Sequence, residues 1–525
     1  MQLRIARLVL ADARALVRAG VEEGVDRAIA CARHEDLVAA NRCGEEVMGP
    51  RQLRGEPDEH PAALEDVFHL QLEYLRVGED PAYDATRLAE GFSDLHPPLS
   101  ERQAQIESQR CLYCFDAPCI EACPSDIDIP RFIRQIGEGN INGAAHTILE
   151  QNILGGSCAR VCPTEILCEQ SCVRNHHEEC QPVLIGLLQR YATDHMRFDG
   201  HPFRRAADSG RHVAVVGAGP AGLSCAHRLA MLGHRVTIFE AETKPGGLNE
   251  YGIARYKMTD DFARREVEFL LGIGGIEIRH GQRLGQNLTL AQLRDDFDAV
   301  FLGLGLGASR ELGLTGEAAP GLMPAVDYIR ELRQAEELAG LPLARRCVVI
   351  GAGNTAIDMA TQMARLGAEE VTLVYRRGVE AMSATGHEQE IAKANGVRML
   401  TWARPAKVLL DGEGQVAGMR FEKTRDESGC LTGTGETFDI AADAIFKAIG
   451  QRFDGASLGD PLAASLVRDG ERIHVGEDFQ TSLPGIYAGG DCIAPGQDLT
   501  VQAVQHGKLA ARAIHQALMI QQEAA

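Results

Sequence analysis

Residues 212–240, HVAVVGAGPAGLSCAHRLAMLGHRVTIFE, decide the fold of this chain. The stretch predicts a short apolar strand, a glycine turn, an amphipathic helix and a second strand. Gly217, Gly219 and Gly222 form the G-x-G-x-x-G pattern of a dinucleotide-binding turn. The first glycine permits the tight turn, the second lets the backbone approach a pyrophosphate at the helix N-terminus, and the third allows close packing of helix on strand.

The two strands, expected at His212–Val216 and Val236–Phe239, give this pattern the context that it requires. Glu240 follows the second strand, eighteen residues beyond Gly222, where a carboxylate can accept hydrogen bonds from the ribose hydroxyls of adenosine. A glycine pattern alone is a weak signal. Strand, helix and acid together favour a bound dinucleotide over a purely structural turn.

A second fingerprint, GAGNTA, spans residues 351–356 after a strand expected at Cys347–Ile350. Alanine stands in its third glycine position, which the motif allows. Two fingerprints in one chain imply two dinucleotides. The candidate binding residues of the second are Gly351, Gly353, Asn354, Thr355 and Ala356.

Basic residues follow the next strand of this second unit. The strand expected at Val371–Val374 leads to Arg376 and Arg377 rather than to an acid. An arginine in this place can bind the 2′-phosphate of NADP, which an acid would repel. A solvated strand end explains the same residues, so NADPH and NADH both remain open.

Three further stretches are expected around a flavin. Gly247 and Leu248 form part of a second glycine turn that can bring backbone against the flavin ring. Asp491 ends a late strand, where it can bind ribityl hydroxyls, and Thr500 and Val501 open a helix whose dipole can face the flavin. The second nucleotide-binding domain is therefore expected as an insertion within the first.

Composition limits the class of protein. At 525 residues and 45% hydrophobic side chains, the chain is long enough for about three domains. Its net charge of −21 argues against nucleic acid or anionic membranes as main partners. No apolar run approaches the length of a membrane span and no secretory signal opens the chain, so we expect a cytoplasmic protein. Its fifteen cysteines then favour metal ligands over a disulfide framework.

Eight of these cysteines fall between residues 111 and 172, in two runs that each contain a Cys-Pro pair. Such spacing lets a short loop surround one soft metal centre and is typical of ferredoxin-type iron-sulfur binding. One or two structural zinc ions are the alternative. A solvated loop is the simpler interpretation of His176, His177 and Cys180. Spacing alone makes ligands of all eight cysteines, which are Cys111, Cys114, Cys119, Cys123, Cys158, Cys162, Cys168 and Cys172.

From about Gly91 onward the chain resembles the NAD(P)H-oxidising half of dihydropyrimidine dehydrogenase and, more loosely, the small subunit of glutamate synthase. The segments that carry the resemblance are CLYCFDAPC at 111–119, CARVCPT at 158–164, GAGNTA at 351–356 and AGGD at 488–491. The resemblance implies FAD at the first fingerprint, NAD(P)H at the second and two [4Fe-4S] clusters.

The resemblance also implies a ligand set that differs from the one expected from spacing. One cluster would take Cys111, Cys114, Cys119 and Cys172. The other would take Cys123, Cys162 and Cys168 with Gln189 as an unusual fourth ligand, and Cys158 would be a spectator.

We therefore expect an α/β protein with two Rossmann-like dinucleotide-binding domains, one inserted in the other, preceded by an α-helical iron-sulfur domain. The extension before it matches nothing familiar. The expected boundaries are 1–90 for a helical extension, 91–205 for the iron-sulfur domain, 206–325 and 451–525 for the FAD-binding domain, and 326–450 for the NAD(P)-binding domain.

By this resemblance the chain is an electron-input subunit of a dihydropyrimidine dehydrogenase, an NAD(P)H-dependent oxidoreductase of the EC 1.3.1 class. Hydride would pass from NADPH or NADH to FAD, and electrons would pass through the clusters to a partner that reduces uracil or thymine. No catalytic side chain is expected, because the flavin supplies the chemistry.

The chain ends soon after the last expected helix, and a barrel needs about 250 residues. FMN and further clusters are therefore expected on a separate subunit, in a hetero-oligomer. A glutamate synthase small subunit or a related electron-bifurcating oxidoreductase is the alternative within the same class. A redox or nucleotide sensor without turnover is the alternative from another class. A disulfide reductase is disfavoured, because neither nucleotide-binding domain contains a closely spaced pair of cysteines.

Overall fold

A computed structural model of the chain describes residues 85–176, 180–453, 459, 461–494 and 496–524. The helical extension expected at residues 1–90 lies outside the described residues, except for helix α4 (Ala85–Gly91) at its end. Apart from residues 425–432, the described residues belong to one compact unit. None of the described helices is long and apolar enough to cross a membrane.

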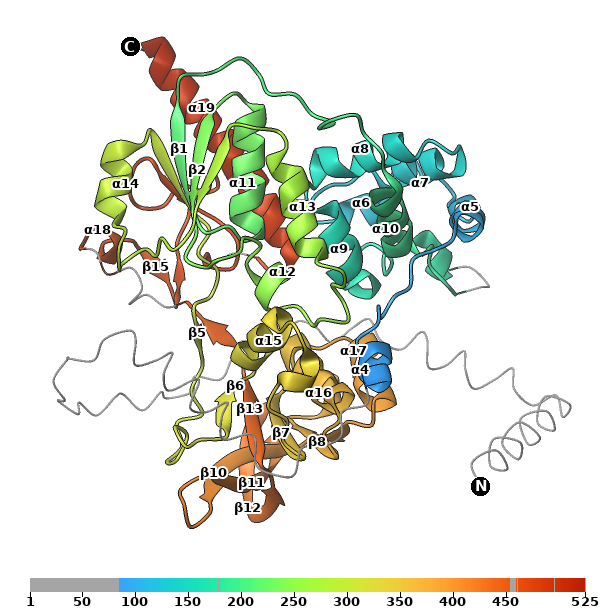
Figure 1. The fold of residues 1–525 in the computed structure, drawn as a ribbon, viewed down its shortest axis with the longest axis vertical. Coiled ribbons are helices and arrows are strands. Elements are labelled where there is room, and N and C mark those ends of the chain that lie inside the picture. The colour runs from blue at the N-terminus through green and yellow to red at the C-terminus, as the bar shows by residue number, and fades with distance from the viewer. Residues whose placement is uncertain (1–84, 177–179, 454–458, 460, 495, 525) are drawn as a thin grey trace, which may run out of the picture. The chain divides into compact units, whose positions relative to one another are not determined.

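The first part of the described chain is helical (Figure 1). Helix α7 illustrates why these segments fold as they do. Asp128 caps its first turn, and Ile129, Phe132, Ile133 and Ile136 recur at helical spacing to form one buried face. The elements that follow α4 are α5 (Glu101–Gln109), α6 (Pro118–Glu121), α7 (Ile129–Gly137), α8 (Ile141–Gln151), α9 (Gly155–Val161), η1 (Thr164–Ile166), η2 (Val173–His176) and α10 (Ile185–His195).

The first sheet is parallel, with strand order β17-β4-β1-β2-β3. Alternate residues of β1 enter different cores, Val213 on one side and Ala214 on the other, so both faces of this sheet are covered. The strands are β1 (His212–Val216), β2 (Arg235–Phe239), β3 (Ile276–Arg279), β4 (Ala299–Leu302) and β17 (Ile486–Ala488). The helices of this part are α11 (Pro220–Met231), α12 (Leu248–Tyr251), α13 (Phe262–Leu271), α14 (Leu290–Asp296), α18 (Pro461–Ala464) and α19 (Thr500–Ala524).

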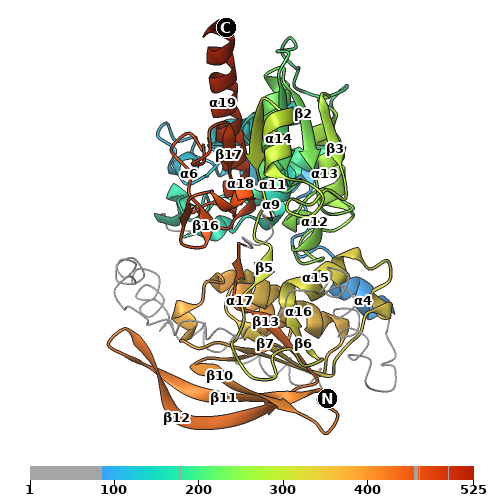
Figure 2. The ribbon, with the colours of Figure 1, turned by 90° about the vertical axis from the view of Figure 1, so that its left-hand side faces the viewer.

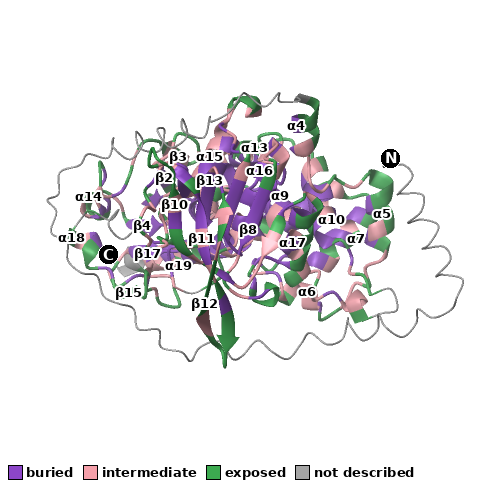
Figure 3. Ribbon diagram, turned by 90° about the horizontal axis from the view of Figure 1, so that it is seen from below, coloured by how far each residue is buried: buried purple, intermediate pink, exposed green. Residues whose placement is uncertain are grey.

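The second sheet has the corresponding parallel order β6-β13-β7-β8-β9. Figure 3 shows that its strands β8 and β13 are largely buried. The strands are β6 (Leu322–Pro324), β7 (Arg346–Gly351), β8 (Glu370–Val374), β9 (Arg398–Leu400) and β13 (Ala444–Ala448). The helices of this part are α15 (Ala325–Gln334), η3 (Leu338–Gly340), α16 (Asn354–Leu366), η4 (Val379–Ala381) and α17 (Gly386–Ala394).

The predicted fold class is confirmed: after β4 the chain builds the second sheet and then returns to the first as β17. The two connections lie side by side, because β5 (Ala308–Ser309) pairs with β14 (Gln451–Arg452). One boundary needs correction. Strand β6 joins the second sheet, although it precedes the boundary expected at residue 326, because a three-residue strand is too short to show a strand period.

A three-stranded sheet that was not predicted covers one face of the second parallel sheet (Figure 2). Val408 and Phe421 of this sheet share a core with Val348 and Ile350 of β7. Its strands are β10 (Ala403–Leu410), β11 (Val416–Glu427) and β12 (Cys430–Ala441). The short pair β15 (Arg468–Asp469) and β16 (Arg472–Ile473) completes the described strands.

Helix α19 packs closely along α11 (Figure 1). Gly507 makes this approach possible, because a methyl group there would overlap the carbonyl oxygen of Ala221 and lie 2.9 Å from the amide nitrogen of Cys225. Ser224 adds a hydrogen bond to the carbonyl oxygen of Val504 at 2.8 Å. The crossing therefore depends on one residue without a side chain.

We predict that Gly507→Ala lowers the free energy of unfolding by about 1–3 kcal/mol, because the new methyl group has backbone on both sides and forces α19 away from α11. Denaturant unfolding followed by circular dichroism measures the change. The matched control is Gly386→Ala, at the exposed start of α17, where a methyl group meets nothing within 4 Å. Equal losses in the two variants would contradict the packing argument.

Candidate functional site: two nucleotide turns and two cysteine groups

The first glycine turn has the geometry that its sequence predicts. Gly217 has φ +97°, and a side chain there would overlap the carbonyl oxygen of Gly303. A side chain at Gly222 would overlap the carbonyl oxygen of Gly217, so the third glycine is required for packing of the helix on its strand. Gly219 caps α11 without a side-chain hydrogen bond. The first amide groups of α11 therefore remain available to a phosphate.

The turn at Gly247 meets the turn at Gly219. Gly247 has φ +55°, and a methyl group on it would lie 2.7 Å from the Cα atom of Gly219. These two predicted cofactor-binding residues are thus brought together through backbone alone. Leu248, the next residue, is 41% exposed at the start of α12, where an apolar side chain is available to cover a ring.

Glu240 is buried beside the first turn rather than facing open solvent. Its carboxylate accepts hydrogen bonds from the amide of Ala218 at 2.6 Å and from the amide of Glu242 at 2.8 Å. Burial raises the pKa of Glu240. The carboxylate thus braces the glycine turn, and its remaining lone pairs can accept from ribose hydroxyls.

The expected flavin-facing residues at the C-terminal end of the chain are anchored to α12. Thr500 donates a hydrogen bond from its hydroxyl to the side-chain oxygen of Asn249 at 3.0 Å, and Val501 is buried behind it. Burial raises the pKa of Asp491 to about 6. A carboxyl group in this position is suited to accept hydrogen bonds from the hydroxyls of a ligand.

The second glycine turn repeats the first. Gly351 has φ +149°, and a side chain there would overlap the carbonyl oxygen of Ala448 at the end of β13, just as Gly217 meets Gly303 after β4. Gly353 caps α16 without a side-chain hydrogen bond. The side-chain oxygen of Asn354 is buried and has no partner among the described residues. A nucleotide with hydrogen-bond donors fits this site.

Thr355 and Ala356 continue the turn into α16. Ala356 is completely buried in the core that also contains Val349 and Phe446. The alanine therefore takes the packing role of the third glycine, as expected for this variant of the motif.

Arg376 and Arg377 lie directly after β8. The carbonyl oxygen of Arg376 accepts a hydrogen bond from the Thr424 hydroxyl at 2.6 Å, and that of Arg377 accepts one from the amide of Trp402. Arg376 is exposed, and within the described residues neither guanidinium has an ion-pair partner. The backbone is fixed while both charges remain available to a phosphate.

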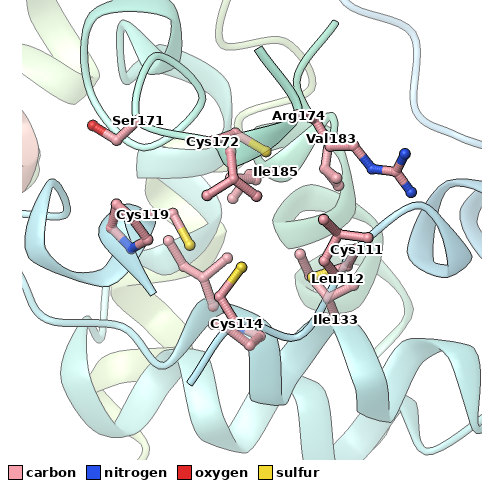
Figure 4. Close-up of a pocket in the computed structure, with 14 residues that line it drawn as sticks. Cys111, Leu112, Cys114, Cys119, Ile133, Ser171, Cys172, Arg174, Val183 and Ile185 are labelled. Atoms are coloured by element: carbon pink, nitrogen blue, oxygen red, sulfur yellow. The ribbon is translucent and has the colours of Figure 1, made fainter. Parts of the chain in front are cut away.

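Four cysteines of the first group surround one pocket. Figure 4 shows the sulfur atoms of Cys111, Cys114, Cys119 and Cys172 directed toward a common space. This space measures about 370 Å³, including its opening to solvent. Its remaining lining is mainly apolar and includes Ile133, Val183 and Ile185. The fold therefore brings together cysteines that lie up to 61 positions apart in the sequence.

Burial favours the protonated form of two thiols of this pocket, those of Cys111 and Cys119. Burial raises the pKa of Cys111 and raises that of Cys119 to about 12, with Cys111 and Cys172 adding to the shift. A metal centre would displace these protons, since thiolate is the ligating form.

The arrangement bears on the choice between zinc and iron-sulfur. A tetrahedral zinc ion holds its sulfurs about 3.8 Å from one another, given Zn–S bonds of about 2.3 Å. Among the described residues no group of three or more His, Cys, Asp and Glu side chains is arranged to bind a single ion. Four cysteines around one pocket of this size suit a multi-atom cluster.

The second group lies deeper. The pKa of Cys162 is raised, first by its hydrogen bond with Cys158 and then by burial, and it responds to the charges of Cys168 and Cys123. These four sulfurs are therefore neighbours. Gln189 on α10 donates its side-chain amide to the carbonyl oxygen of Gly155 at 2.7 Å, which leaves its oxygen as the atom that can bind a metal.

The contacts that hold this second group were not found by sequence reasoning. Glu266 of α13 is buried and accepts hydrogen bonds from the amides of Gly156 and Ser157 at 2.8 and 3.0 Å, which caps α9 from another part of the chain. A second contact is made by Lys508 of α19, which donates to the carbonyl oxygen of Ser125 at 2.9 Å. Helices α13 and α19 thus both contact the segments that carry the second cysteine group.

Neither His176 nor Cys180, which follow the second cysteine run, lines the pocket of the first group. Cys180 is exposed and has φ +45°, and His176 ends η2, while residue 177 lies outside the described residues. No metal role is assigned to them.

Known proteins match both halves of this arrangement. Residues 211–507 match the family described as pyridine nucleotide-disulphide oxidoreductase. Residues 88–200 match the family described as dihydropyrimidine dehydrogenase domain II, 4Fe-4S cluster.

The proteins similar to this chain include two sequence relatives and one solved structure. The glutamate synthase (NADPH) small chain of Escherichia coli K12 is 34% identical over 445 residues, which are 81% of this chain and 93% of that one. The NAD-dependent dihydropyrimidine dehydrogenase subunit PreT of the same organism is 35% identical over 427 residues, 81% and 96% respectively. The solved oxidoreductase FprA of Mycobacterium tuberculosis covers 60% of this chain and 86% of its own at 18% identity and a TM-score of 0.49.

We predict that Arg376→Ala raises the KM for NADPH far more than the KM for NADH. The difference between the two effects corresponds to about 1.5–3 kcal/mol of binding free energy, because the variant loses a charged hydrogen bond to the 2′-phosphate. Steady-state dye reduction with each nucleotide measures the difference. The matched control, Arg398→Ala, removes another exposed arginine, on the neighbouring strand β9. Equal effects of Arg376→Ala on both nucleotides would mean that Arg376 does not bind the phosphate.

Proposed function

We propose, because the chain belongs to the pyridine nucleotide-disulphide oxidoreductase family, that it is the electron-input subunit of a dihydropyrimidine dehydrogenase. Family membership makes it an NAD(P)H-dependent oxidoreductase with FAD and a [4Fe-4S] cluster. The proposal adds a second [4Fe-4S] cluster and an FMN-containing partner in a hetero-oligomer. That partner reduces uracil or thymine, an activity of the EC 1.3.1 class.

One observation carries the proposal: a single helix, α19, joins the flavin turn to the second cysteine group. Thr500, at its first position, contacts α12 beside the flavin turn. Two turns later Lys508 binds the carbonyl oxygen of Ser125, two residues beyond Cys123. This arrangement supports electron transfer from the flavin to the inner group, Cys123, Cys162, Cys168 and Gln189.

The position of the other cysteine group, here called the outer group, supports electron transfer to a partner protein. Cys111, Cys114, Cys119 and Cys172 surround a pocket that opens at the surface. Leu112 lines this pocket and is 48% exposed, and Phe115, next to Cys114, is fully exposed. Apolar side chains beside a redox centre suit a protein partner that covers them.

When bound, FAD supplies the step from two-electron hydride chemistry to one-electron transfer. The side chains of this protein contribute position and electrostatics. Glu240 braces the adenosine end of the first turn, Asp491 binds the ribityl chain, and the helix dipole of α19 faces the flavin. Arg376 and Arg377 select the nicotinamide cofactor.

The pyrimidine assignment rests on the similarity to the subunit PreT, at 35% identity over 96% of that protein, and on the match of residues 88–200. The small chain of glutamate synthase, at 34% identity over 93% of its length, supports the second candidate, an input subunit for glutamate formation. Both candidates share the electron path and differ in the partner.

The test is uracil-dependent oxidation of NAD(P)H by the chain alone and with a co-expressed FMN-containing subunit. We expect dye reduction but no uracil turnover by the chain alone, because its two fingerprints are assigned to FAD and NAD(P)H and the flavin that reduces uracil is expected on the partner. Uracil turnover should appear with the partner.

Turnover of uracil by the isolated chain would overturn the half-enzyme proposal. Formation of glutamate from glutamine and 2-oxoglutarate with a large-subunit partner would establish the second candidate instead. Absence of dye reduction with either nucleotide would favour a sensor without turnover.

We predict that the anaerobically purified chain holds about eight irons in two four-iron clusters. Cys111→Ala should lose about half of this iron, since alanine cannot replace a thiolate. Iron analysis and visible absorption measure the content. Stoichiometric zinc without iron-sulfur absorption would contradict the assignment.

Two further variants test the ligand set. Cys158→Ala is the matched control and should keep both clusters, because Cys162 already supplies the sulfur of that turn. Gln189→Leu should disturb the inner cluster only. Loss of one cluster in the Cys158 variant would restore the assignment of all eight cysteines as ligands.

A further inference from the structure

Within the described part of the chain, Lys508 is a buried cation that forms no ion pair with a carboxylate. Its side chain is in α19, the residue is 2% exposed, and its ammonium group donates to the carbonyl oxygen of Ser125 at 2.9 Å and to the side-chain oxygen of Gln151 at 3.1 Å. Both acceptors are neutral. The nearest acid of that loop, Asp126, instead accepts a hydrogen bond from Gln505 at 3.0 Å.

Other buried cations of the described chain have carboxylate partners. Lys257 lies 2.7 Å from both Asp358 and Glu388. Lys447 lies 2.6 and 2.9 Å from Glu311 and Glu317. The two buried arginines follow the same rule, since Arg160 pairs with Asp194 and Arg190 with Asp94 and Asp194. Lys508 is the exception.

An uncompensated buried charge is expensive. The cations Arg228 and Arg512 on α11 and α19 add to the cost, and the charge of Asp126 offsets it only in part, since the pKa of Lys508 is still lowered. Burial and Arg512 lower the pKa of Lys508 to about 8. A positive group that is retained under these conditions requires a nearby negative charge.

The inner cysteine group can provide that charge. Ser125 lies two residues beyond Cys123, whose side chain is buried in the same region. A [4Fe-4S] core of charge 2+ with three thiolates and a neutral glutamine ligand has a net charge of 1−. One electron takes the core to 1+ and the whole centre to 2−, so a neighbouring cation stabilises the reduced form more than the oxidised one.

We propose that Lys508 is the counter-charge of the inner cluster and raises its reduction potential, so that this cluster accepts electrons from the flavin end of α19. The inference rests on the proposed function, because it requires a cluster at Cys123, Cys162, Cys168 and Gln189. Lys508 lies seven residues beyond Val501, which is about 10 Å along a helix. Its charge therefore lies on the helix that joins the proposed flavin site to the loop after Cys123.

The test is a redox titration of the anaerobically purified, iron-loaded chain, with each cluster followed by electron paramagnetic resonance. In Lys508→Met the ratio of reduced to oxidised inner cluster at a fixed potential should fall about tenfold, which is a shift of 59 mV to lower potential for a one-electron couple. The outer cluster, at Cys111, should keep its potential. Lys508→Gln removes the same charge with a polar side chain and should give the same shift.

Two controls separate charge from structure. Arg512→Met removes an exposed cation one turn further along the same helix, where solvent screens it more strongly than Lys508, and it should shift the inner potential much less than Lys508→Met does. Gln505→Leu loosens the same loop from α19 without removing a charge, and it should leave the inner potential unchanged.

An unchanged potential of the inner cluster in both Lys508 variants would overturn the inference. An equal shift in Gln505→Leu would overturn it as well, because it would show that the position of the loop alone sets the potential. Iron content and the number of cluster signals in the unmodified chain report separately on the proposed function. A chain with two clusters and unshifted variants would thus reject the role of Lys508 and retain the electron-input assignment.

Discussion

The close crossing of α11 and α19 is the constraint on which this structure depends. Both helices begin at the proposed flavin site, α11 at the glycine turn and α19 beside α12. Gly222 brings α11 against its strand, and Gly507 brings α19 against α11. Because these contacts are between backbone atoms, little freedom remains in the position of α19. The flavin turn and the loop after Cys123 are therefore held by one rigid element.

The part of the chain that contains the second glycine turn is joined to the first part by buried ion pairs, rather than by close backbone contacts at glycines. Lys257, in the chain between α12 and α13, is buried between Asp358 of α16 and Glu388 of α17. Tyr256 beside it donates a hydrogen bond to Asp358 at 3.1 Å, and its carbonyl oxygen accepts one from the amide of Leu95. All three parts of the chain meet at this network. Removing one member would leave an unpaired buried charge, which is the costly case for such pairs.

Local patterns made much of this structure predictable. Strands β1, β2, β7 and β8 follow from short apolar runs, and both glycine turns follow from glycines whose backbone positions allow no side chain. The insertion of one parallel sheet in the other follows from the order of the two fingerprints. Contacts between distant segments were not predictable in this way. Glu266 caps a helix 109 residues earlier, and Lys508 binds a carbonyl 383 residues away. Of these two contacts, only the one made by Lys508 is indicated by the sequence. This lysine lies among the apolar residues Val501, Val504 and Ala511, which form the buried face of α19.

The ligand assignment shows the same limit, since spacing makes all eight cysteines equivalent and their division into two groups came from the family resemblance. The structure brings Cys111, Cys114, Cys119 and Cys172 to one pocket. Diffraction from crystals of the iron-loaded chain with FAD, recorded at the iron absorption edge, tests the account most directly. We predict two four-iron peaks, with the one at Cys123, Cys162 and Cys168 between the flavin and the one at Cys111. Single-ion peaks at the cysteines, or a flavin closer to the Cys111 group than to the Cys123 group, would contradict it.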